Sequence, residues 1–74
     1  MGPLSGNVDM AMQLDPEDAA KNYMAFDGFD NLTKYLTGKN AADIRLFIRT
    51  LTDDPDFGEI DSRVVNMAEK ILAD

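Results

Sequence analysis

The residues with the greatest capacity for chemistry are the carboxylates of one short acidic segment, residues 53–61. Its acidic side chains are Asp53, Asp54, Asp56, Glu59 and Asp61. Carboxylates this close together can ligate a hard cation, share an acid–base reaction, or attract a basic partner from a solvated turn. Cation binding and catalysis both need further groups at defined spacings, so the neighbouring residues decide between these alternatives.

The composition argues against an enzyme. The chain contains no Cys and no His, which removes disulfides, thiolate chemistry, most zinc sites and every His-based catalytic arrangement. The carboxylates also fall in expected turns and helix caps, and 74 residues leave no room for a second domain that would form a cleft. We therefore expect no catalytic residues and no cofactor.

Charge and hydropathy limit the partners. Fourteen acidic and seven basic residues give a net charge of −7, which disfavours nucleic acid and favours a basic partner, or simply keeps a small protein soluble. The apolar fraction of 45% is typical of a folded domain. Apolar runs are too short to span a membrane, so we expect no direct membrane insertion and a cytoplasmic protein.

Apolar residues recur at helical spacing along most of the chain, and no segment alternates as a strand does. We therefore predict an all-α protein with four short helices. These run roughly over residues 6–14, 27–37, 41–52 and from about 62 to 72. Good helix formers at residues 17–21 leave room for one short extra turn. Residues 1–6 are expected to be a flexible tail that an expression vector would explain in part, and residues 7–74 a single domain.

The helix ends carry capping signals. Asp27 is expected to cap the second helix, and Gly38 to end it in a left-handed conformation. Asn40 is expected to cap the third helix, and Asp61 or Ser62 the fourth. Between the third and fourth helices lies the acidic, Gly-containing turn, so the second half of the chain is a helix, a polar turn and a helix.

Two segments carry a resemblance to a known family. Leu36-Thr37-Gly38-Lys39-Asn40-Ala41-Ala42-Asp43-Ile44 is similar to the linker between paired EF-hands, and Gly58-Glu59-Ile60-Asp61 to the middle of an EF-hand loop. Over residues 8–72 the chain thus resembles one lobe of the calmodulin and myosin light-chain family, and most of all the small single-lobe light chains of class I myosins. The resemblance implies two degenerate EF-hand-like helix-loop-helix units.

The second loop lacks the calcium ligands of that family. An EF-hand loop places oxygen ligands at positions 1, 3, 5, 7, 9 and 12, with a bidentate Glu at the last. With Ile60 at position 8, Asp53 falls at position 1, but Pro55, Phe57 and Val64 occupy positions 3, 5 and 12. Two oxygens and the bidentate carboxylate are lost, so we expect no calcium site.

The first loop is poorer still. With Met24 at position 8, Ala19, Lys21 and Gly28 occupy positions 3, 5 and 12. We interpret both loops as structural and expect no metal. The resemblance also implies that the loops pair, with Met24 and Ile60 forming a short antiparallel backbone bridge.

The resemblance implies a calcium-independent light chain. Its partner would be an IQ-type segment, a basic amphipathic helix in the neck of a myosin heavy chain. The resemblance to single-lobe light chains implies a heavy chain of class I. We expect a free monomer that associates with the actin cortex through its heavy chain. Unbranched Met suits surfaces that repack around a partner helix, and the chain is rich in it.

The expected contacts are apolar side chains of a groove and carboxylates around its rim. The groove or core residues are Met12, Met24, Phe29, Leu32, Leu36, Phe47, Leu51, Met67 and Ile71. The rim residues are Asp53, Asp54, Asp56 and Glu59. Two other functions remain open: a small acidic inhibitor or nucleic-acid mimic that occupies a basic site on another protein, and an unrelated four-helix adaptor.

Overall fold

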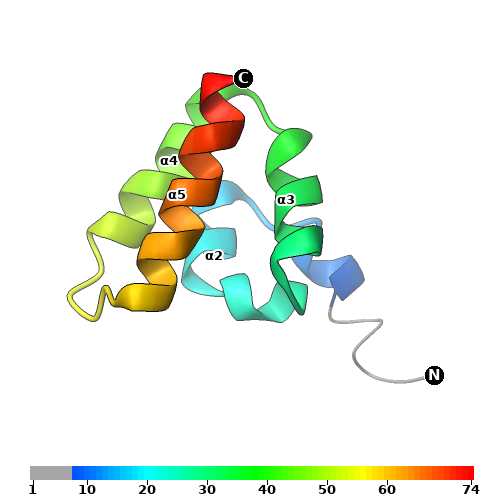
Figure 1. Ribbon diagram of the computed structural model, residues 1–74. Helices are drawn as coiled ribbons and strands as arrows, with labels where there is room; N and C mark the ends of the chain where they lie inside the picture. The colour runs from blue at the N-terminus through cyan, green and yellow to red at the C-terminus, as the bar shows by residue number, and fades with distance from the viewer. Residues whose placement is uncertain (1–7) are drawn as a thin grey trace.

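The computed structural model describes residues 8–74 and is helical along most of that length (Figure 1). The expected all-α class is confirmed, and residues 8–74 contain no β-strand. In chain order the helical parts are residues 8–11, α2 (Pro16–Lys21), the 3-10 helix η1 (Tyr23–Phe26), α3 (Phe29–Thr37), α4 (Ala41–Thr52) and α5 (Glu59–Ala73). Two helical parts are additional to the four expected helices: α2, which lies where one short extra turn was considered possible, and η1. The expected tail, residues 1–6, lies outside the described residues.

The longer helices pack in an up-and-down arrangement. α4 contacts both α2 and α5, and α5 also contacts α3. Figure 1 shows α4 running antiparallel to α3 and α5, as the short joints between consecutive helices require. As a result α3 and α5 begin at the same end of the molecule, where η1 and the acidic turn also lie. We call this the loop end.

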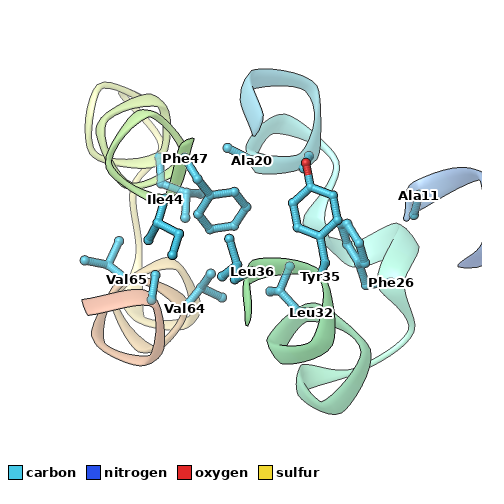
Figure 2. Close-up of a cluster of buried hydrophobic side chains, with 13 residues drawn as sticks. Ala11, Ala20, Phe26, Leu32, Tyr35, Leu36, Ile44, Phe47, Val64 and Val65 are labelled. Atoms are coloured by element: carbon cyan, nitrogen blue, oxygen red, sulfur yellow. The ribbon is translucent and has the colours of Figure 1, made fainter. Parts of the chain in front are cut away.

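The core lies between the helices and is formed by one side chain cluster (Figure 2). Its buried members are Ala11, Ala19, Ala20, Phe26, Leu32, Tyr35, Leu36, Ile44, Phe47, Leu51, Val64, Val65 and Ala68. Phe47 of α4 lies at the centre, between Ala20 of α2 and Leu36 of α3. The rings of Phe26 and Tyr35 pack at a centroid distance of 5.0 Å, which fastens η1 to α3.

Side-chain caps start two of the helices. The Asn40 side chain accepts a hydrogen bond from the backbone N–H of Asp43 at 2.8 Å, which confirms the expected cap of α4. Pro16 occupies the first position of α2, where its missing N–H has no cost. Asp15 caps α2 by accepting from the N–H of Asp18 at 2.9 Å. The Tyr35 hydroxyl donates to the Leu14 carbonyl at 2.5 Å and holds this joint against α3.

The expected caps of α3 differ from the structure in two ways: Asp27 is not the N-cap, and Gly38 is the C-cap as expected but is not left-handed. Asp27 does not cap α3: it adopts the left-handed conformation, with φ 58° and ψ 42°, and closes η1, so that Gly28 precedes the helix. The reason is that residues 23–26 form a helical turn of their own, which moves the start of α3 to Phe29. Gly38 is right-handed, with φ −82°, and its N–H donates to the Lys34 carbonyl, so the last turn needs no left-handed residue.

Two other boundaries also differ from the expectation. α5 begins at Glu59, with Gly58 in the cap position, rather than after Asp61 or Ser62. Asp61 acts from inside the first turn, where its Oδ2 accepts the N–H of Gly58 at 2.8 Å. The first helical segment ends after residue 11 and not at Leu14, because the following hydrogen bonds are those of tight turns.

Candidate functional site: an apolar pocket at the loop end

A pocket of about 360 Å³ opens at the loop end, where η1 and the first turns of α3 and α5 meet. It is lined by Tyr23, Met24, Asp27, Gly28, Phe29, Leu32 and Ile60. Three of these side chains are large, apolar and exposed: Met24 by 74%, Ile60 by 54% and Phe29 by 43%. Clustered exposed apolar side chains of this kind mark surfaces for ligands or other proteins.

The backbone at residues 22–28 presents the pocket residues outwards. Phe26 is fully buried and anchors η1, which leaves Tyr23 and Met24 at the surface end of this short helix. The chain then reverses through two consecutive positive-φ residues, Asp27 at 58° and Gly28 at 126°. The Asn31 side-chain amide donates to the Phe26 carbonyl at 2.8 Å and fixes this corner to α3.

A side-chain hydrogen bond joins the two walls of the pocket. The Tyr23 hydroxyl donates to Oδ1 of Asp61, thereby linking η1 to α5. This bond, together with burial and the negative charges of Asp61 and Asp54, raises the pKa of Tyr23 to about 12. The same bond, and then the N–H of Gly58, lowers the pKa of the Asp61 carboxyl. Asp61 therefore links η1 to the start of α5 through its side chain.

This bond predicts a pH-dependent loss of stability in Tyr23→Phe. At pH 7 the variant should lose about 1 kcal/mol of unfolding free energy, since a partly exposed hydrogen bond to a carboxylate is removed. The Asp61 pKa is lowered in the folded protein, so the difference from wild type should shrink as the pH falls through that pKa. The Tyr23 pKa is raised, so the difference should also shrink as the pH rises from about 10 to about 12.

Urea unfolding followed by circular dichroism at several pH values measures both trends. Asp61→Asn is the partner variant, and the double variant should lose less than the sum of the two single losses, because both remove one interaction. Equal losses for Tyr23→Phe at all pH values would contradict the bond.

The expected contact residues fall into different parts of the structure. Four of them, Leu32, Leu36, Phe47 and Leu51, are buried in the core. Met24 and Phe29 meet at the loop-end pocket, and Leu32 forms part of its wall as well. Tyr23, Asp27, Gly28 and Ile60, which were not among the expected contacts, complete this surface. Of these, only Ile60 could have been found from the sequence, because it was expected to lie opposite Met24 in the loop pair.

The other three expected contacts lie elsewhere. Met67 is half-buried between α5 and α3, where its Sδ accepts the Thr33 hydroxyl at 3.0 Å. Ile71 lines a different hollow, near the end of α5, together with Ile44 and Leu72. Met12 follows the first helical segment and is exposed. The nine residues therefore do not form one continuous groove in this conformation.

The expected rim carboxylates are all exposed around the turn between α4 and α5. Asp54 organises that turn, because its Oδ1 accepts the N–H of Asp56 at 2.8 Å. The negative charge of Asp54 also contributes to the raised pKa of Tyr23. The acidic turn therefore acts electrostatically on a residue that lines the pocket. Within residues 8–74, no three acidic side chains are placed where they could hold a metal ion together.

The expected backbone bridge between the loops is absent. No backbone hydrogen bond joins Met24 and Ile60 in the part of the chain that the structure describes. Met24 lies in η1, where its C=O accepts the N–H of Asp27, and Ile60 lies in the first turn of α5, so neither residue has the extended backbone that a bridge requires. Their side chains nevertheless line the same pocket, and the Tyr23–Asp61 bond replaces the backbone pair as the link between the loops.

The chain matches no family model, no curated protein and no solved structure. Its function must therefore be argued from the site. Among the described helices, none has the length and apolar character needed to cross a bilayer.

Proposed function

We propose that this protein is a calcium-independent light chain that binds a basic amphipathic helix, an IQ-type segment in the neck of a class I myosin. The observation that carries the proposal is the loop-end pocket, with Met24, Phe29 and Ile60 exposed on an acidic protein. An amphipathic helix buries its apolar face in such a depression, while its Lys and Arg residues meet carboxylates around it.

Apolar contact and charge have different effects in this proposal. The three exposed apolar side chains supply most of the affinity, since they leave water when the helix docks. The carboxylates of the acidic turn are exposed, and exposed ion pairs are worth about 0–1 kcal/mol each. They orient the partner and speed its arrival, as charge complementarity does at other interfaces.

The mechanical result of binding is a stiffer neck. An isolated helix is marginally stable in water, and packing against a folded domain is what stabilises it. A monomer of this protein bound along the neck would therefore make that helix a better lever. The protein would act in the cytoplasm, at the actin cortex, where its heavy chain carries it.

The proposal predicts that calcium has no effect on binding. A synthetic IQ-type peptide should bind with the same affinity in excess calcium and in chelator, because positions 3, 5 and 12 of the second loop hold Pro55, Phe57 and Val64. Isothermal titration calorimetry in the two buffers measures this directly. Amide NMR spectra of the free protein during a millimolar calcium titration provide the control.

Two outcomes would contradict the proposal. Chemical shifts at residues 53–61 that saturate at micromolar calcium would show a cation site in the acidic turn. Absence of peptide binding in both buffers would remove the light-chain function. An acidic inhibitor or nucleic-acid mimic would then be favoured if a basic protein or polycation still bound and was released by salt.

A further inference from the structure

The loop-end pocket combines apolar side chains with one carboxylate. Asp27 lines it beside the rings of Tyr23 and Phe29 and the flexible chain of Met24. Within residues 8–74, the side chain of Asp27 takes part in no hydrogen bond and in no ion pair. A large apolar side chain that filled the pocket would strip water from this carboxylate without replacing it, at a cost in free energy.

The backbone that holds Asp27 in the pocket is in an uncommon conformation. Asp27 has φ 58°, and it is the non-glycine residue with positive φ in the described chain, followed by Gly28 at 126°. A side chain added at Gly28 would meet no atom within 4 Å, so this glycine is required by its backbone angle and not by crowding. Left-handed residues other than glycine are sparsely populated, carry backbone strain and often lie at functional sites.

The local field favours a cation. Asp30 lies in the first turn of α3, close in sequence to Asp27, and both carboxylates are exposed. The N-terminal end of α3 carries a partial positive charge of about half an elementary charge. The two negative carboxylates exceed it, so the net local charge is negative. Asp61 does not line the pocket and is bonded to Tyr23, so Asp27 is the carboxylate that the pocket offers a partner.

We propose that the loop-end pocket takes an arginine side chain of the partner helix, an inference that rests on the proposed function. The guanidinium pairs with the carboxylate of Asp27 and stacks on the ring of Phe29, while the methylene chain lies against Met24 and Ile60. Arginine fits this combination because its guanidinium is planar, forms paired hydrogen bonds with a carboxylate and stacks on aromatic rings. Lysine offers a point charge and lacks the stacking plane.

The test compares three helical peptides that differ at one anchor position. A basic amphipathic peptide carries Arg, Lys or norleucine at the centre of its apolar face, and each is titrated into the protein by calorimetry at about 0.15 M salt. We expect the Arg peptide to bind about 10-fold more tightly than the norleucine peptide, with Lys in between. Asp27→Asn should abolish this preference.

Asp30→Asn is the matched control, because it removes an equal charge from the same corner but does not line the pocket. This variant should lower the affinity for all three peptides by a similar factor, so that the Arg peptide still binds most tightly and the norleucine peptide least tightly. Norleucine binding as tightly as Arg, or a preference for Arg that survives in Asp27→Asn, would overturn the inference while leaving the light-chain function intact.

A second measurement separates the two proposals if none of the peptides binds. N-acetylarginine amide and N-acetylnorleucine amide are titrated at millimolar concentration while the methyl signals of Met24 and Ile60 are followed by NMR. Shifts caused by the arginine compound that disappear in Asp27→Asn would support the pocket after the light-chain function had failed. No such shifts would overturn both.

Discussion

Phe47→Ala should lose about 3–5 kcal/mol of unfolding free energy, which is enough to unfold much of this small domain. Phe47 has no exposed surface and lies at the centre of the core, between residues of α2 and α3 (Figure 2). Removing its ring leaves a cavity that surrounding helices fill only in part. Urea unfolding followed by circular dichroism measures the loss, and thermal unfolding of the variant measures how much helix remains at room temperature.

Phe57→Ala is the matched control for this variant. Phe57 lies in the turn before α5 and is 39% exposed, so its truncation should cost about 1 kcal/mol or less. Phe29→Ala should also cost less than Phe47→Ala, since the Phe29 ring faces the loop-end pocket. Similar losses for all three phenylalanines would show that the core is not organised as described.

The second large effect is expected in binding. Replacing both Met24 and Ile60 by Ser should weaken the IQ-type peptide by roughly 30- to 150-fold, because two apolar side chains no longer leave water on docking, at about 1–1.5 kcal/mol each. Both side chains are mostly solvent-exposed in the free protein, so its unfolding free energy should change little. Calorimetry with the peptide and urea unfolding of the free variant measure the two quantities.

Leu46→Ser is the control for a general loss of surface hydrophobicity. Leu46 is exposed on the solvent-facing side of α4, beside Arg45 and Arg49. It does not line the loop-end pocket. Its substitution should leave peptide affinity unchanged. An equal loss for Leu46→Ser would move the binding surface to α4.

Salt distinguishes a light chain from an acidic mimic in the same assay. Raising salt from about 0.05 to about 0.5 M should slow association but keep much of the affinity, because exposed charges are screened and apolar contacts are not. Binding that collapses in salt and is indifferent to Met24 and Ile60 would favour the mimic.

The helices that follow directly from local residue pattern were predicted well. α4 begins after the Asn40 cap and covers the predicted residues 41–52, because its apolar stripe, its cap and its end all lie within the segment. α3 has its predicted end at Thr37, although its start is shifted. Helical periodicity and capping depend on neighbours within a few residues, so the sequence carries them without reference to the rest of the fold.

The conformation of residues 15–28 was not predictable in the same way. Neither α2, with six residues, nor η1, with four, is long enough to repeat an apolar period, and each is stabilised mainly by what it packs against. Phe26 is held by the Tyr35 ring and Ala20 by the core around Phe47. The left-handed Asp27 follows from this packing, since the chain must reverse between a buried Phe26 and the start of α3.

The division between core and binding surface depended on packing as well. Phe29, Leu32 and Leu36 share one apolar stripe of α3, and their sequence spacing makes them equivalent. In the structure α5 and the core cover Leu32 and Leu36, while Phe29 remains 43% exposed at the helix start. Periodicity identifies the apolar face of a helix, but which part of that face is covered depends on where the other helices end. The pocket lies at the loop end, where α3 and α5 begin beside η1, and within residues 8–74 no other helix contributes to its lining.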